Sequence, residues 1–167
     1  MKAREIARFG LLTAAALVLG YIERFIPLAP GIPGIKLGLS NTVLLYAIYL
    51  MNWKSAICLM LLKVTLSGLL FSGISAMLYA FAGGALSLLV MVLLHRAKGF
   101  SIVGVSVAGA VVHNIGQIAV ACLVVRTQAL LGYLPVLLIA GVVTGVLTGM
   151  VARLVILALE KTGGAGR

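Results

Sequence analysis

The polar residues best suited to chemistry lie inside apolar segments. The stretch 102–125 carries His113, Asn114 and Gln117 near its middle. In a helix His113 and Gln117 share one face, and Asn114 lies one step round. Hydrogen-bonding side chains in an apolar span are costly unless they meet one another, backbone groups or a ligand. This face therefore either joins helices by hydrogen bonds or lines a ligand site, and we favour the ligand site.

Lys63 lies near the middle of another apolar stretch, too deep for its ammonium group to reach water easily. It could pair with Glu23, or it could face a cavity that receives an anion. The chain has three acidic residues, none of them aspartate, against thirteen Lys and Arg, so its cations cannot all be paired internally. We therefore expect Lys63 to face an anion-binding cavity.

The composition indicates a single membrane domain. Of the 167 residues, 63% are hydrophobic, and the mean hydropathy is +1.24. Such a chain has too few polar residues to cover a soluble surface. The net charge of +10 does not indicate a nucleic-acid partner, because the basic residues are scattered at segment ends and form no continuous face.

The pattern of apolar runs predicts an all-α membrane protein with six transmembrane helices. A crossing needs about 20 mostly apolar residues. The predicted helices, which form one domain over residues 1–167, are 5–26, 37–51, 55–71, 74–94, 102–125 and 134–159. The segment 37–51 is short for a crossing, and a re-entrant segment there would leave five spans. Pro27–Gly34, with three prolines and two glycines, is predicted to be a loop.

The distribution of basic residues predicts the orientation. With six spans, nine of the thirteen fall on one side, which should be the cytoplasm and should hold both termini. These nine are Lys2, Arg4, Arg8, Lys54, Arg96, Lys98, Arg153, Lys161 and Arg167. The other four are Arg24, Lys36, Lys63 and Arg126, of which Arg24 is most simply paired with Glu23.

The depth of the polar residues in the predicted spans, and the side of the membrane on which they fall, together predict one pocket that opens to the outside. Lysine and histidine there would donate to phosphate or carboxylate oxygens, and apolar neighbours would hold a hydrocarbon tail. A prenyl diphosphate fits this description, and so does a flat vitamin-like acid. For Lys36 and Arg126 the alternative is a solvated loop cation. The predicted substrate-binding residues are Lys36, Asn41, Lys63, Tyr79, His113, Asn114, Gln117 and Arg126.

Small residues form stripes on three of the predicted helices. They allow helices to approach closely in lipid, where packing must supply the contact. Gly141, Gly145 and Gly149 share a face, as do Ala76, Ala80 and Gly84, and we expect both stripes to pack internally. The stripe of the first helix reaches its cytoplasmic end, so partner docking and internal packing are equally open there. This stripe comprises Ala3, Ala7, Gly10 and Ala14.

Two stretches carry a resemblance to a known family. They are Gly34–Asn41 (GIKLGLSN) and Val112–Gln117 (VHNIGQ). The chain resembles the membrane family called heptaprenyl diphosphate synthase component I, or Gx transporters. That family is similar in turn to the substrate-binding S components of energy-coupling factor (ECF) importers. The resemblance implies six helices, a lid formed by Pro27–Gly34, and docking of the first-helix stripe to a coupling subunit.

The residues argue against catalysis by this chain alone. Prenyl chain elongation uses clustered aspartates to hold magnesium, whereas the three glutamates lie far apart at Glu5, Glu23 and Glu160. The sequence contains no P-loop, and no second ligand is spaced to join His113 at a metal. We therefore expect neither enzyme activity, cofactor nor metal.

The function expected from the sequence is that of an importer subunit in a prokaryotic plasma membrane. It would capture an anionic small molecule, such as an isoprenoid diphosphate or a precursor of one. A coupling subunit and two ATPase subunits would be its partners. The alternative is a non-catalytic membrane component of a heptaprenyl diphosphate synthase.

Overall fold

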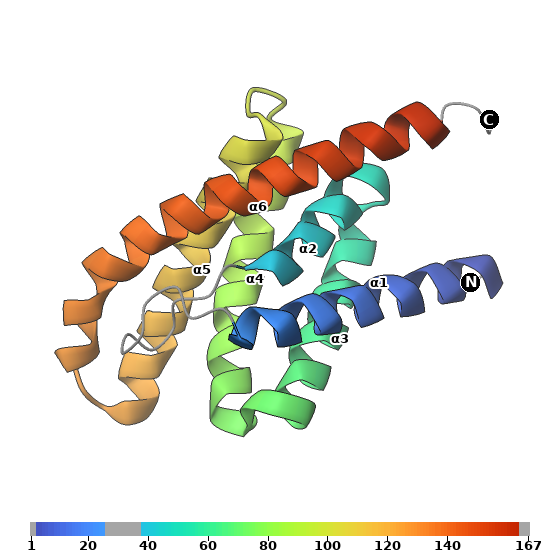
Figure 1. The fold of residues 1–167 in the computed structure, drawn as a ribbon. Helices are drawn as coiled ribbons and strands as arrows, with labels where there is room; N and C mark the ends of the chain where they lie inside the picture. The colour runs from blue at the N-terminus through green and yellow to red at the C-terminus, as the bar shows by residue number, and fades with distance from the viewer. Residues whose placement is uncertain (1–2, 26–37, 164–167) are drawn as a thin grey trace.

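The computed structural model describes residues 3–25 and 38–163, and this part of the chain is almost entirely helical (Figure 1). The predicted loop Pro27–Gly34 lies outside the described residues. The α-helices are α1 (Ala3–Ile22), α2 (Leu39–Leu50), α3 (Trp53–Ser67), α4 (Ile74–Arg96), α5 (Ile102–Val125) and α6 (Leu134–Gly163). Three short helical turns, at Glu23–Phe25, Gly68–Ser72 and Ala129–Tyr133, adjoin them. The all-α prediction and the presence of six α-helices are confirmed within these ranges, and the expectation that all six cross a membrane stays a prediction.

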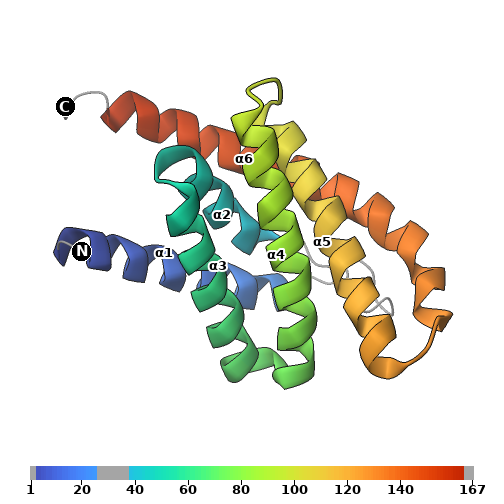
Figure 2. The same cartoon turned by 180° about the vertical axis from the view of Figure 1, so that it is seen from behind.

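The helices form two layers. Helices α3, α4 and α5 stand side by side in one layer (Figure 2), and α1, α2 and α6 cross them in the other (Figure 1). Helix α5 packs most extensively, against α4 in its own layer and α6 in the other. The short helix α2 contacts α1, α3, α4 and α6. The core consequently lies between the layers, around α2.

Side-chain caps explain where two helices begin. Asn52 accepts a hydrogen bond from the Ser55 backbone N–H at 2.8 Å, so α3 begins at Trp53, two residues before the prediction. Ser101 accepts from the Gly104 N–H at 3.1 Å and starts α5 where the sequence predicted it. Helix α6 continues to Gly163, beyond the predicted end at residue 159.

Four helical segments are long and apolar enough to cross a membrane, namely Trp53–Ser72, Ile74–Arg96, Ile102–Val125 and Ala129–Leu159. Two apolar helices, Ile6–Ile22 and Leu39–Leu50, are shorter. At about 1.5 Å per residue, the 12 residues of α2 fall well short of a hydrocarbon core about 30 Å thick. Many large apolar side chains are exposed on the outer faces, Leu123 and Leu154 among them, as suits a multi-pass membrane protein.

The glycine stripe of α6 packs inside the protein, as predicted. A Cβ atom on Gly145 would lie 2.7 Å from the Val107 Cα of α5, and one on Gly149 would lie 2.8 Å from the Val103 Cα. Both distances are shorter than any normal contact with backbone. These glycines therefore set how closely α5 and α6 approach. On α4, Gly84 is buried beside Met60 of α3.

The small-residue stripe of α1 differs from that of α6. Ala7, Gly10 and Ala14 are exposed, and a Cβ on Gly10 would meet no atom within 4 Å. The side chain of Ala3 lies outside the described part. Within the described chain, this face of α1 is therefore not packed against another helix, which leaves it available to lipid or a partner.

A pair of alanine substitutions tests this difference. Gly145→Ala should destabilise the protein by about 1–3 kcal/mol, because the new methyl group meets backbone that cannot move aside easily. Gly10→Ala should be neutral or stabilising, since alanine favours helix over glycine by about 0.8–1.0 kcal/mol. Thermal unfolding of both purified variants in detergent measures the effect. Equal stability of the two variants would contradict the close packing of α5 on α6.

Candidate functional site

A cavity of about 590 Å³ lies between the two layers. Helices α2 to α6 each line it with several residues. The end of α1 contributes Gly20, and the turn that follows contributes Glu23. Its volume falls within the range of about 300–1,000 Å³ that is typical of small-molecule sites. Six of the eight predicted substrate-binding residues line this cavity, namely Asn41, Lys63, Tyr79, His113, Asn114 and Gln117.

Lys63 and Asn41 form the best-defined polar contact in the cavity. The Lys63 ammonium donates to Asn41 Oδ1 at 2.7 Å, which joins α3 to the first turn of α2. Both residues are half-buried. The hydrogen bond lowers the cost of a lysine at this depth and fixes the direction of its side chain. An arriving anion would therefore meet an ammonium group that is already positioned.

Glu23 lines the same cavity as Lys63, the residue with which the sequence analysis considered pairing it. Its side chain is 5% exposed, and its Oε1 accepts a hydrogen bond from the Gly38 backbone N–H. Gly38 adopts the left-handed conformation (φ 71°) that favours glycine, immediately before α2. The carboxylate therefore stabilises the positive end of the α2 dipole. The predicted surface pairing of Glu23 with Arg24 cannot be compared, because the Arg24 side chain lies outside the described residues.

The polar face of α5 lies close to α4 because Gly83 has no side chain. A Cβ there would be 2.6 Å from the His113 carbonyl oxygen and 2.7 Å from Gln117 Cγ. On the other side of the crossing, a Cβ on Gly116 would lie 3.0 Å from the Gly83 Cα. This close approach brings His113 and Gln117 to the cavity wall, which Tyr79 of α4 also lines.

Asn114 has a structural role in addition to lining the cavity. Its Nδ2 donates to the Leu137 backbone carbonyl of α6 at 2.7 Å. The alternative considered for this face, a hydrogen bond that joins helices, therefore holds for Asn114. A Cβ on Gly141 would lie 2.9 Å from the same Nδ2, so glycine is needed to admit this amide.

A group of hydroxyl side chains completes the lining and was missed by the sequence analysis. Ser106 and Thr148 lie 3.1 Å apart between their hydroxyl oxygens, and Thr148 also donates to the Thr144 carbonyl at 2.9 Å. All three are buried and line the cavity, as does Ser87. Their only sequence signal is the spacing of four between Thr144 and Thr148. Small hydroxyls in apolar helices are common enough that this spacing alone does not indicate a site.

Two predicted site residues are not part of the described cavity. Lys36 lies outside the described residues. Arg126 is exposed and does not line the cavity, in contrast to the prediction. It follows the last residue of α5 in the left-handed conformation (φ 53°), with its backbone N–H bonded to the Cys122 carbonyl. This capping geometry turns the chain away from the bundle, so Arg126 ends α5 at the surface.

The described charges of the cavity are balanced. Lys63 supplies a cation and Glu23 a carboxyl group, and both line the same space. Asn41 already binds Lys63, and the expectation that the cavity receives an anion stays a prediction. Among the described residues no three His, Cys, Asp or Glu side chains are grouped to hold a metal ion.

Comparison with known proteins assigns the family. The sequence model of the family described as heptaprenyl diphosphate synthase component I matches residues 12–155, which is most of the chain. This chain belongs to that family. No curated protein and no solved structure matches it.

The component I family name describes one part of a synthase. The word component implies at least one further subunit, and it agrees with the expectation that this chain is not itself the catalyst. The match therefore favours the alternative function considered for the sequence over the importer. The likeness to ECF S components is not shown by these comparisons.

The two roles of the α5 polar face in this component I protein can be separated. Asn114→Ala should lower stability by about 0.6–2 kcal/mol, the range measured for hydrogen bonds between membrane helices, because α5 loses its bond to α6. Gln117→Ala, on the same face but beside α4, should cost less. Unfolding in mixed micelles measures both variants. A larger loss for Gln117→Ala would contradict the assigned role of Asn114.

Proposed function

We propose that this chain is the non-catalytic membrane component of a prenyl diphosphate synthase. It holds an amphipathic prenyl diphosphate for a catalytic subunit that acts on it. The observation that carries the proposal is the family match together with a mostly apolar cavity that also has polar and charged side chains in its lining. The chain's lack of aspartate agrees with a binding role, because magnesium-dependent chemistry would then belong to the partner.

The cavity suits a ligand with one charged end. Lys63, Asn41 and His113 line the cavity and offer donors for phosphate oxygens. Leu45, Met77, Met91, Ile118 and Leu137 supply much of the remaining lining and would hold a hydrocarbon chain. Both methionines have flexible side chains that can adapt to an isoprenoid.

We further propose that the protein crosses the plasma membrane of a prokaryote, with both termini in the cytoplasm. The support is the excess of basic residues on one side and the apolar outer surface. The start of α1 and the end of α6 lie toward the same side of the molecule (Figure 1), as an even number of crossings requires.

Ligand binding tests the proposed site. The purified protein should bind farnesyl diphosphate at least tenfold more tightly than farnesol, because hydrogen bonds to a charged group contribute about 1.5–3 kcal/mol. Lys63→Ala should remove most of this preference. Lys161→Ala, which removes an exposed lysine near the end of α6, is the matched control. Isothermal titration in detergent measures the affinity of each of the three proteins for both ligands.

Equal binding of the diphosphate and the alcohol by the parent protein would overturn the recognition of an anion. Loss of the preference in Lys161→Ala as well would show a general charge effect and would also count against the cavity. His113→Ala should weaken diphosphate binding in the same direction as Lys63→Ala. A folded His113→Ala variant with unchanged affinity would remove His113 from the site.

A second candidate is the importer subunit, favoured by one observation. The Ala7, Gly10 and Ala14 face of α1 is exposed and unpacked, as a surface that docks another membrane helix would be. In this alternative, the protein would capture its ligand from outside while docked to a coupling subunit that two ATPases drive.

Co-purification from native membranes distinguishes the two functions. The synthase component should recover a soluble prenyl synthase subunit and no ATPase, identified by mass spectrometry. Recovery of an ATPase pair with a membrane coupling protein would instead support the importer. In that case Gly10→Leu should abolish the association, because a large side chain would block the α1 face. The control is Gly132→Leu. Gly132 lies outside α1, and a Cβ atom there would meet no atom within 4 Å.

A further inference from the structure

A second cavity, of about 300 Å³, lies at the end of the bundle where α2 leads into α3 and where α4 ends. Its lining comes from α2, α3 and α4 and the short turn between the first two. None of these residues lines the interlayer cavity. The lining residues are Ile48, Tyr49, Met51, Asn52, Trp53, Val92, His95 and Arg96.

Trp53 organises the charged side of this cavity. The Arg96 guanidinium carbon and the Lys54 ammonium nitrogen each lie 5.7 Å from a ring centroid of Trp53. Cations at this distance are attracted to the negative face of an aromatic ring. In the same lining, the rings of Tyr49 and His95 lie 4.3 Å apart between centroids. The aromatic groups thus hold basic side chains at the cavity.

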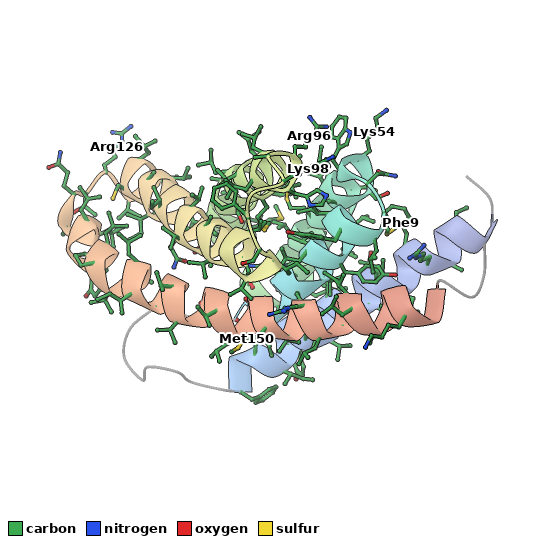
Figure 3. The ribbon with its side chains drawn as sticks, turned by 90° about the horizontal axis from the view of Figure 1, so that it is seen from above. Phe9, Lys54, Arg96, Lys98, Arg126 and Met150 are labelled. Carbon is green, nitrogen blue, oxygen red and sulfur yellow. The ribbon has the colours of Figure 1, made fainter. Side chains whose placement is uncertain are left out.

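The cavity carries positive charge that the described part of the protein does not balance. Lys54, Arg96 and Lys98 are exposed and gather at this end of the bundle, away from Arg126 (Figure 3). Glu23 is the one acidic residue whose side chain the structure describes, and it lies in the other cavity. Helix α3 also begins here, and the positive end of its dipole adds to the field.

An explanation without a ligand is that the basic residues stabilise the C-terminus of α4. It accounts for Arg96 and His95, which lie in the last turn of that helix. It does not account for Lys54, which lies in the first turn of α3, where a cation is unfavourable. A ligand that attracts both Lys54 and Arg96 explains why both cations lie against Trp53.

The surface next to the cavity is apolar and exposed. Leu93 precedes Arg96 by three residues and Ile57 follows Trp53 by four, so each shares a helix face with a cavity residue. Both are exposed, as are Leu89 and Leu61 one turn further along. A molecule with its anionic head in the cavity would therefore have its hydrocarbon chains along α3 and α4. This continuity points to a lipid and not to a free phosphate.

We propose that this second cavity binds the headgroup of an anionic phospholipid. The phosphate group lies between Arg96 and Lys54 beside Trp53, and the acyl chains run along the exposed faces of α3 and α4. Basic pockets between membrane helices commonly bind such headgroups. The proposal does not depend on the ligand or partner of the interlayer cavity.

The chain provides its own probe, because Trp53 is its single tryptophan. The full-length protein is placed in bilayers that contain phosphatidylglycerol or phosphatidylcholine with brominated acyl chains, which quench nearby tryptophan. Brominated phosphatidylglycerol should compete for the site at least about fivefold better than brominated phosphatidylcholine. In Arg96→Gln the ratio between the two lipids should fall to near one. Arg153 is an exposed arginine of α6 outside the cavity, so Arg153→Gln should keep the ratio of the parent protein.

Additional measurements separate the remaining outcomes. In 0.5 M salt the preference should weaken, because screening acts on exposed charges. Excess inorganic phosphate should leave the quenching unchanged, and displacement of the lipid by phosphate would overturn the assignment to a lipid. Equal quenching by the two lipids in the folded parent protein would also overturn it. If Arg96→Gln fails to fold, Lys54→Gln replaces it. A folded variant of either residue that fully retains the preference for phosphatidylglycerol would contradict the site.

Discussion

The structure depends on the scarcity of hydrogen-bond partners in an apolar environment. Lipid cannot satisfy an amide or an ammonium group, so such groups inside a membrane protein must meet one another, backbone or a ligand. Here they converge between two layers of helices. Lys63 binds Asn41, Asn114 binds the Leu137 carbonyl, and Ser106 contacts Thr148. These contacts join α3 to α2 and α5 to α6, so the groups that line the cavity also connect its walls.

The short helix α2 makes this arrangement possible. Its 12 residues are mostly buried, and its first turn lies at the cavity. A helix that crossed the whole bundle would fill this space with its own side chains. Because α2 begins at the cavity, its N-terminal dipole, Asn41 and the Glu23–Gly38 hydrogen bond all come together there. The result is a group of polar side chains in a largely apolar cavity.

The two cavities differ in the surroundings of their charged side chains. In the interlayer cavity Lys63 has an amide partner and a carboxyl group in the same lining. At the end formed by Trp53 and Arg96, the basic groups are exposed and are organised by aromatic rings. This difference is the basis for proposing a small-molecule ligand at the first site and a lipid headgroup at the second. An assignment of function to basic residues must therefore consider their depth and neighbours as well as their number.

Hydropathy and helix periodicity alone determined that this is an all-helical membrane protein, because each apolar run had to become a helix in lipid. They also placed His113 and Gln117 on one face and selected Asn41, Lys63 and Tyr79, since deep polar residues are too costly to occur without a role. The tertiary structure decided which residues meet. It brought Glu23 into the cavity, left Arg126 at the surface, and buried the Gly145 stripe while exposing that of Gly10. Similar stripes have different surroundings because spacing along one helix does not specify which helix packs against it.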